Sequence, residues 1–334
     1  MDQPGEEFFY PMYDTCDGVS ARCPIEATTY GDYFTLGACA FFVGIYGALL
    51  IAQAYLGWRS RAWAFVAWLA AGTAFELMGY AARIYMSFNP WSFEGLVINS
   101  MMLVLGPTLT AAAISVTFKH LVLWYGPEWS LIKPGLYPWV FVGTDFISIV
   151  IQGAGGGISA IANGMEDGRS LYDAGSAMLV AGVSFQVANM VLCGALMLVY
   201  VWRRKRAMKQ KTNAGGHGGS SKKWSLLAVL RGHETANRAE HMAKVFIAGL
   251  TTAYVAIIIR CIYRIPEMSM GWANELMQNE TLFLILDGAM ILLAAMLLTV
   301  VHPALLFPFM GKVGEEKEQI MAERAEQREM REVL

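Results

Sequence analysis

Charge is scarce in this sequence. Only 16% of its 334 residues are Asp, Glu, Lys or Arg, whereas 56% are hydrophobic, and the mean hydropathy is +0.42. Soluble domains contain about 25% charged residues. The shortage of charge excludes a soluble cytosolic enzyme and a disordered chain. Five cysteines in a chain of this length exclude a disulfide-rich secreted fold.

The motifs of several enzyme classes are also missing. The chain contains no Walker A sequence and no Gly-x-Ser-x-Gly elbow. A catalytic zinc needs about three converging protein ligands, and the histidines do not provide such a group: they are His120, His217, His233, His241 and His302. We therefore expect a protein that is not an enzyme, with no metal, no cofactor and no nucleic-acid partner.

Seven apolar runs are each about as long as the ~20 residues that cross a bilayer. They occupy residues 33–56, 62–84, 95–122, 136–158, 175–201, 244–264 and 281–307. Because the runs are continuously apolar rather than alternating, a membrane β-barrel is excluded. The sequence predicts an all-α, polytopic membrane protein built as a bundle of seven transmembrane helices. We expect interruptions at Pro107 in the third span and at the glycines of residues 153–157 in the fourth. These glycines lie inside an apolar span, so close helix packing or a bend is favoured there over a phosphate-binding loop.

Basic residues predict the orientation, because cytoplasmic loops carry an excess of Lys and Arg. With the N-terminus outside, all but five of the 25 Lys and Arg residues lie on the inner side; the exceptions are Arg22, Arg83, Arg169, Arg260 and Arg264. The sequence therefore predicts an exterior segment 1–32, a membrane domain 33–307 with a basic cytoplasmic loop 202–243, and a charged cytoplasmic tail 308–334. An exterior N-terminus permits a disulfide between Cys16 and Cys23, with two free or otherwise paired thiols as the alternative.

Polar side chains within the predicted spans are the candidates for a functional site, because such groups are costly in lipid and usually face the bundle interior or water. Several recur at helical spacing and so share a face. The candidates for substrate binding or gating are Glu76, Arg83, Asp145, Gln152, Gln186, Arg260, Arg264, Glu267, Glu280, Asp287 and His302. Two interpretations remain open: a site toward the exterior leaflet, or an ion-pair network that locks helices together, for example Glu76 or Asp287 with an arginine of the sixth span. His302 is either a helix-end cap or a proton-linked gate.

Three of these segments carry a resemblance to a known family. They are FELMGYAAR at 75–83, DFISIVIQ at 145–152 with the glycines after it, and RCIYRIPE at 260–267. They are joined by Gly182, Gln186, Gly271, Glu280, Asp287 and the pair His302-Pro303. In this combination, over about residues 30–310, the chain resembles the fungal RTA1-like, or lipid-translocating exporter, family of seven-span proteins.

The resemblance implies transport or leaflet translocation of amphipathic lipids and resistance to toxic ones. A sphingoid long-chain base is one candidate substrate, and its ammonium head would suit the carboxylates of the site. A porphyrin is another, and its carboxylates would suit Arg83, Arg260 and Arg264. The alternative function is a seven-helix lipid sensor or receptor, although Asp-Arg-Tyr and Asn-Pro-x-x-Tyr are missing from the third and seventh spans. We expect an integral protein of the plasma membrane whose partners are a lipid substrate and membrane lipids; the sequence does not fix its oligomeric state.

Overall fold

The computed structural model describes residues 11–13, 15–60, 63–125, 130, 135–163, 168–214, 226–270 and 273–302. All regular structure in these residues is helical. The elements are η1 (Ile25–Ala27), α1 (Leu36–Ser60), α2 (Trp63–Phe88), α3 (Phe93–Tyr125), α4 (Leu136–Asn163), α5 (Arg169–Ala214), α6 (Leu226–Ser269), α7 (Glu275–Gln278), α8 (Glu280–Phe283), η3 (Leu284–Ala289) and α9 (Met290–Val300).

Seven stretches of helix are long and apolar enough to cross a membrane. They are Leu36–Ser60, Trp63–Phe88, Phe93–Val122, Trp139–Ser159, Arg169–Arg204, Lys244–Ser269 and Glu280–Val300. Each overlaps one predicted span, so the prediction of an all-α chain with seven membrane-spanning helices is confirmed. The predicted tail 308–334, the middle of loop 202–243 and the last residues of the predicted seventh span lie outside the described residues.

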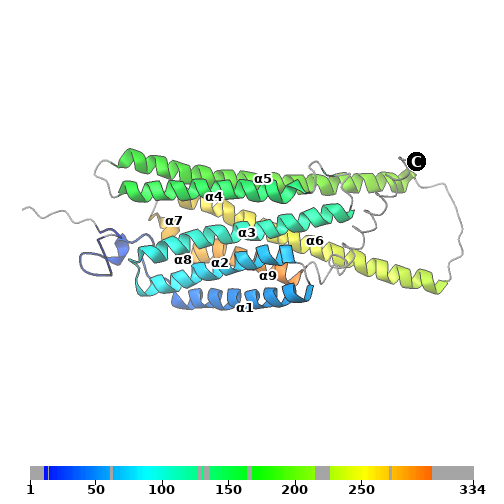
Figure 1. Cartoon of the computed structure of the whole chain (residues 1–334), viewed down its shortest axis with the longest axis horizontal. Coiled ribbons are helices and arrows are strands. Elements are labelled where there is room, and N and C mark those ends of the chain that lie inside the picture. The colour runs from blue at the N-terminus through cyan, green and yellow to red at the C-terminus, as the bar shows by residue number, and fades with distance from the viewer. Residues whose placement is uncertain are drawn as a thin grey trace, which may run out of the picture.

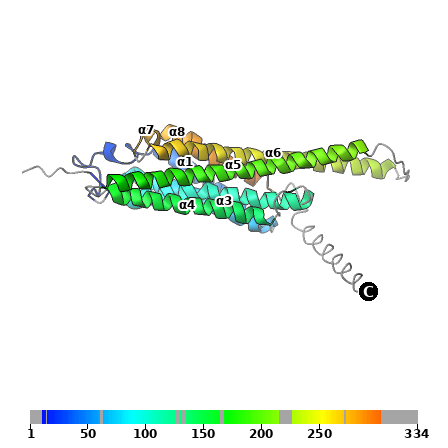
Figure 2. The same cartoon turned by 90° about the horizontal axis from the view of Figure 1, so that it is seen from above.

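The helices run along one common axis as an elongated bundle (Figures 1 and 2). In Figure 1, α4 and α5 run together along one side and α1 lies along the other, with α2 and α3 between them. The α3 span is the central one, because 67% of an apolar 18-residue stretch within it is buried, against 22% of the corresponding stretch of α1. Helix α3 is therefore placed to contact most of the other spans.

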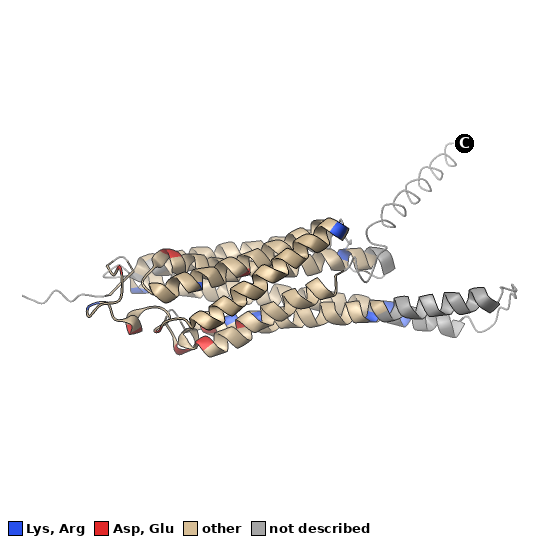
Figure 3. Cartoon of the chain, turned by 90° about the horizontal axis from the view of Figure 1, so that it is seen from below, with Lys and Arg blue, Asp and Glu red and all other residues tan. Residues whose placement is uncertain are grey.

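Apolar side chains cover both the inside and the outside of this bundle. The largest internal cluster includes Leu69, Ile114, Phe246, Ile257 and Ile291. Large apolar side chains such as Ile51, Trp58 and Leu198 are also exposed, which suits contact with lipid chains rather than water. Figure 3 shows the charged residues gathered toward the ends of the helices, with few along their length.

The predicted interruptions of the third and fourth spans are wrong. Helix α3 continues through Pro107, and α4 continues through the glycines of residues 153–157. A proline within a helix is tolerated in a membrane when a neighbour satisfies the backbone group that it frees, and the site described below contains that neighbour. The glycines serve helix packing instead.

Gly155 lets the backbones of α4 and α5 approach closely. A Cβ atom at this position would lie 2.7 Å from the carbonyl oxygen of Gly175 and 2.8 Å from the amide nitrogen of Leu179. Conversely, a Cβ atom at Gly175 would lie 2.7 Å from the amide nitrogen of Ser159. Small residues at such contacts drive helix association in membranes, so α4 and α5 form a tightly packed pair.

Gly155→Ala is therefore expected to lower the free energy of unfolding by about 1–3 kcal/mol, the usual cost of overpacking. The melting temperature of the purified protein in detergent measures the effect. Gly157→Ala is the matched control, because a Cβ atom at Gly157 meets nothing within 4 Å. Equal melting temperatures for the two variants would contradict the close approach of the two helices.

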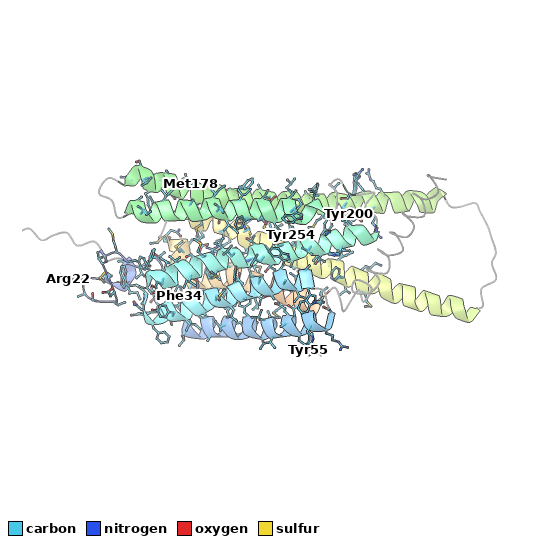
Figure 4. The ribbon with its side chains drawn as sticks, viewed as in Figure 1. Arg22, Phe34, Tyr55, Met178, Tyr200 and Tyr254 are labelled. Atoms are coloured by element: carbon cyan, nitrogen blue, oxygen red, sulfur yellow. A yellow bond between two sulfur atoms is a disulfide. The ribbon has the colours of Figure 1, made fainter. Side chains whose placement is uncertain are left out.

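The N-terminal segment packs on the end of the bundle beside the turn between α2 and α3. Cys16 and Cys23 form a disulfide, with their Cα atoms 6.0 Å apart. The Trp91 indole donates a hydrogen bond to the carbonyl of Cys23 at 3.2 Å, and the Asn89 amide donates one to the carbonyl of Asp17 at 3.0 Å. Figure 4 labels Arg22 in this segment and Phe34 where it enters the bundle.

Candidate functional site

A buried ion network joins α6 to the seventh span. Asp287 lies in η3 and is 0% exposed. Its Oδ1 atom is 2.6 Å from Nε of Arg260 and 3.5 Å from Nε of Arg264. Arg264 also contacts Glu267, with Nη1 and Oε2 3.3 Å apart. The predicted pairing of Asp287 with the arginines of the sixth span is therefore present, and Arg264 is shared between two carboxylates.

Local backbone structure places these charges opposite one another. Arg260 and Arg264 are four residues apart on α6 and so lie on one face. Asp287 lies in a π-helical segment, in which one extra residue widens the turn; such segments are frequent at functional sites. The next residue, Gly288, packs tightly against Tyr80 and Phe42, which fixes the seventh span against α1 and α2.

Arg260 also explains how α3 tolerates Pro107. Proline has no backbone N–H, so it cannot donate to the carbonyl four residues earlier, that of Leu103. The Arg260 guanidinium donates a hydrogen bond to this carbonyl. One arginine therefore satisfies the backbone group freed in α3 and pairs with the carboxylate of the seventh span.

The carboxylate of Glu76 is buried against α3. It is 1% exposed, and a Cβ atom at Gly106 would lie 2.6 Å from its Oε1 atom. Among the described residues neither of its oxygens has a hydrogen-bond partner. Within the described part of the chain, Glu76 therefore forms no ion pair, and its carboxylate is buried between α2 and α3.

Arg83 lies two turns from Glu76 on α2, as the spacing predicts, but its surroundings are aromatic. It is 1% exposed, and its Nε atom donates a hydrogen bond to the Asn99 side chain at 3.2 Å. Its guanidinium carbon lies 3.7 Å from the ring centre of Phe283 and 4.5 Å from that of Phe34. Cation–π contacts therefore stabilise this charge in place of a carboxylate.

A cavity of about 90 Å³ lies beside the network, between α3, α4, α5 and α6. Three charged side chains line it: Arg260, Arg264 and Glu267. Most of the remaining wall is apolar, and the uncharged polar contributions come from Tyr30, Asn99, Ser100, Gln152 and Gln186. A water needs about 10–15 Å³ by the same measure, and a cavity of about 150 Å³ holds one benzene molecule, so this space suits a small polar group but not a long hydrocarbon chain.

Amide side chains continue from the cavity between α3, α4 and α5. Gln152 donates a hydrogen bond to the Gln186 side chain at 3.0 Å, and Gln186 donates one to the hydroxyl of Thr108 at 3.0 Å. Further along the same helices, Asn189 donates to Asp145 at 2.7 Å. Asp145 thus shares this polar arrangement and not the arginine network.

Two other candidates lie apart from both groups. The Glu280 carboxylate accepts hydrogen bonds from the backbone N–H of Thr35 at 2.9 Å and from its hydroxyl at 2.7 Å, so it caps the start of α1. His302 is buried beyond the end of α9, with its ring edge-on to Phe65 at 5.3 Å. Neither residue lines the cavity.

Several residues of the site were not among those predicted from the sequence. Thr108 and Asn99 are polar residues within an apolar run, which is a usable signal. The aromatic side chains around Arg83 carry no such signal, because aromatic residues are common throughout membrane helices and their contacts depend on the tertiary fold. They are Tyr30, Phe34 and Phe283.

The chain is similar in sequence to a known protein family and to several yeast proteins. Residues 69–310 match the model of the family described as RTA1 like protein. A sphingoid long-chain base transporter, RSB1 of Saccharomyces cerevisiae, is 29% identical over 276 residues, which cover 80% of this chain and 71% of the relative. Protein RTM1 of the same organism is 27% identical, covering 69% and 64% of the two chains. Protein RTA1 is 25% identical, covering 75% and 68%. No solved structure matches the chain.

Proposed function

This chain is an integral membrane protein of the RTA1-like family, and from that premise we propose that it translocates amphipathic lipids, with sphingoid long-chain bases as substrates. The relative named as a sphingoid long-chain base transporter supports the substrate class. The observation that carries the proposal is the cavity, which brings ionic side chains and apolar wall together within the spans. The proposal includes no catalytic step and no cofactor.

Glu267 is the residue that we expect to receive the ammonium head. It lines the cavity, and among the described residues it forms an ion pair only with Arg264, which already lies 3.5 Å from Asp287. An entering ammonium group can replace Arg264 at Glu267, because Arg264 has Asp287 as its alternative partner. Neither oxygen of Asp287 has an aligned hydrogen bond among the described residues. Asp287 can therefore accept a closer hydrogen bond from Arg264.

The hydrocarbon tail must lie largely outside the cavity. A sphingoid chain is too large for about 90 Å³, and the wall beyond the charged groups is formed by side chains such as Ile149, Leu179 and Val183. These apolar residues belong to α4 and α5, whose other faces carry exposed apolar side chains. The head therefore binds within the bundle while the tail extends toward the acyl chains of the membrane.

A carboxylate lipid or a porphyrin fits this charge arrangement less well. Arg260 and Arg264 are already paired with carboxylates. Arg83 does not line the cavity; its neighbours Asn99 and Phe283 do. An anionic head would therefore have to separate existing ion pairs and would leave buried carboxylates without partners, which is costly.

Transfer by the purified protein in liposomes tests this function. A fluorescent sphingoid base should move between leaflets faster in proteoliposomes than in protein-free liposomes, and faster than its N-acylated analogue, which has no ammonium group. Binding without transfer would favour a lipid sensor. Preferential transfer of a carboxylate lipid or porphyrin would overturn the sphingoid-base assignment, and a chemically altered lipid would indicate an enzyme.

We further propose that segment 1–32 is exterior, that loop 202–243 and tail 308–334 are cytoplasmic, and that the protein resides in the plasma membrane. The distribution of basic residues and the disulfide of the N-terminal segment support this orientation. An impermeant thiol reagent should label Val19→Cys, which replaces an exposed side chain of the N-terminal segment, on intact cells, whereas His217→Cys should react only after permeabilisation. The three remaining cysteines are buried. The reverse labelling pattern would contradict the orientation.

A further inference from the structure

A translocated lipid must carry its polar head through the hydrocarbon core, which is about 30 Å thick. Burying an ammonium group there without partners is prohibitive. If the proposed function holds, the protein must therefore provide polar partners beyond the cavity. The structure contains such partners in a group of five side chains, which we call the polar seam: Thr108, Asp145, Gln152, Gln186 and Asn189.

The polar seam begins at the cavity. Gln152 and Gln186 line the cavity wall and are hydrogen-bonded to each other. Gln186 continues to Thr108 of α3. On the same two helices, seven residues before Gln152 and three after Gln186, Asp145 and Asn189 form the second hydrogen-bonded pair. Both pairs bridge α4 and α5, so the partners follow one another along a single helix interface.

The polar seam lies at the depth of the membrane where burying a charged head group costs the most free energy. Asp145 lies six residues from Trp139, where the α4 span begins, and Gln152 lies seven residues from its end at Ser159. At about 1.5 Å per residue, these positions are about 9 Å and about 10 Å from the two edges of the span. The polar seam therefore crosses the middle third of the membrane.

Asp145 is the one charged residue of the polar seam. It is 5% exposed, its Oδ1 atom accepts a hydrogen bond from Asn189, and it forms no ion pair within the described part of the chain. Whereas Asp287 and Glu267 already face arginines, Asp145 has a carboxylate available to an incoming cation.

A second group of polar side chains lies elsewhere in the bundle and provides a comparison. Gln53 of α1 donates hydrogen bonds to Thr73 of α2 at 3.0 Å and to Thr299 of α9 at 2.9 Å. None of these three residues lines the cavity. They join α1, α2 and α9, and these two hydrogen bonds do not connect them to a residue that lines the cavity.

We propose that the polar seam is the path by which the head group leaves the cavity toward the opposite leaflet, and that Asp145 is a second binding site for its ammonium group. The head group passes from Glu267 along the two glutamines to Asp145 and Asn189. The tail remains in lipid beside α4, where Phe146 and Val150 are exposed.

The test compares binding with transfer in the same protein preparations. Binding of a fluorescent sphingoid base is measured in detergent, and its transfer is measured in liposomes as loss of fluorescence after a membrane-impermeant reductant is added. Asp145→Asn keeps the shape of the side chain and should slow transfer about tenfold or more, the loss expected for one charged contact. Binding at the cavity should stay within about threefold of the original protein, and the melting temperature should not change.

Two control variants separate the polar seam from the rest of the bundle. Thr299→Val removes a hydroxyl from the comparison group and should leave transfer unchanged. Glu267→Gln should weaken binding and transfer together. If Asp145→Asn lowers the melting temperature, Thr108→Val decides instead: slower transfer with binding retained supports the path, and unchanged transfer overturns it.

The outcomes also distinguish this inference from the proposed function. If the original protein transfers no lipid, the translocator function itself fails. If the original protein and both polar-seam variants transfer at the same rate, only the path is wrong. Loss of binding by Asp145→Asn at unchanged melting temperature would place Asp145 in the first binding site and would also overturn the path.

Discussion

Asp287→Asn is expected to lower the free energy of unfolding by about 3–5 kcal/mol, because removing one partner of a buried ion pair leaves the other charge uncompensated. Asp287 is fully buried and faces both Arg260 and Arg264. The amide nearly keeps the shape of the carboxylate, so the loss would reflect charge rather than volume. The melting temperature of the purified protein in detergent, with and without added lipid, measures it.

Two further variants show whether this loss arises from unpaired arginines. Adding Arg260→Met to Asp287→Asn should restore part of the stability, because Arg260 is the charge that loses its carboxylate, whereas Arg264 keeps Glu267 as a partner. Glu280→Gln also deletes a carboxylate, but at the exposed start of α1, and should cost about 1 kcal/mol or less. If Asp287→Asn melts at the temperature of the original protein, the network does not hold α6 to the seventh span.

The second large effect concerns binding. Glu267→Gln is expected to weaken binding of a sphingoid base by about 2 kcal/mol, or roughly 30-fold, because a charged hydrogen bond to the ammonium head is lost. Stability should change much less than in Asp287→Asn, since Arg264 keeps Asp287 as a partner. Competition binding in detergent at fixed salt measures the change in affinity.

An N-acylated lipid of the same chain length is the control ligand for this variant. It has no ammonium group, so its affinity should be the same for Glu267→Gln and the original protein. An equal loss of affinity for both lipids would mean that Glu267 shapes the cavity instead of receiving the charge. Tighter binding of a carboxylate lipid to the original protein would transfer the recognition role to the arginines.

The carboxylates of Asp287 and Glu267 share Arg264, but we expect them to have different roles. Asp287 is buried behind the cavity and holds the arginines in place. Glu267 lines the cavity and has a partner that can move to another carboxylate. A buried ion pair is weak evidence for stability in itself. In the proposed mechanism, its value is that a cation can enter without leaving an arginine unpaired.

The sequence alone determined the seven spans. It also placed Arg260 and Arg264 on one helical face, because hydropathy and side-chain spacing are local properties that a single helix expresses. It identified every acidic residue of the network, since charges in apolar runs stand out without any knowledge of contacts. The resemblance carried by residues 75–83, 145–152 and 260–267 indicated the family that the match over residues 69–310 shows.

Only the tertiary structure decided which charges meet. The sequence left Glu76 and Asp287 as equal partners for the arginines, and the choice depends on the rotation of each helix and on the π-helical segment around Asp287. The expected break at Pro107 is wrong. Arg260, on a helix about 150 residues away in the chain, donates a hydrogen bond to the backbone carbonyl that the proline leaves without a partner. Glu280 lies on the same span as Asp287 but caps α1. Spacing fixes a residue's face on its own helix, whereas packing between helices fixes what that face meets.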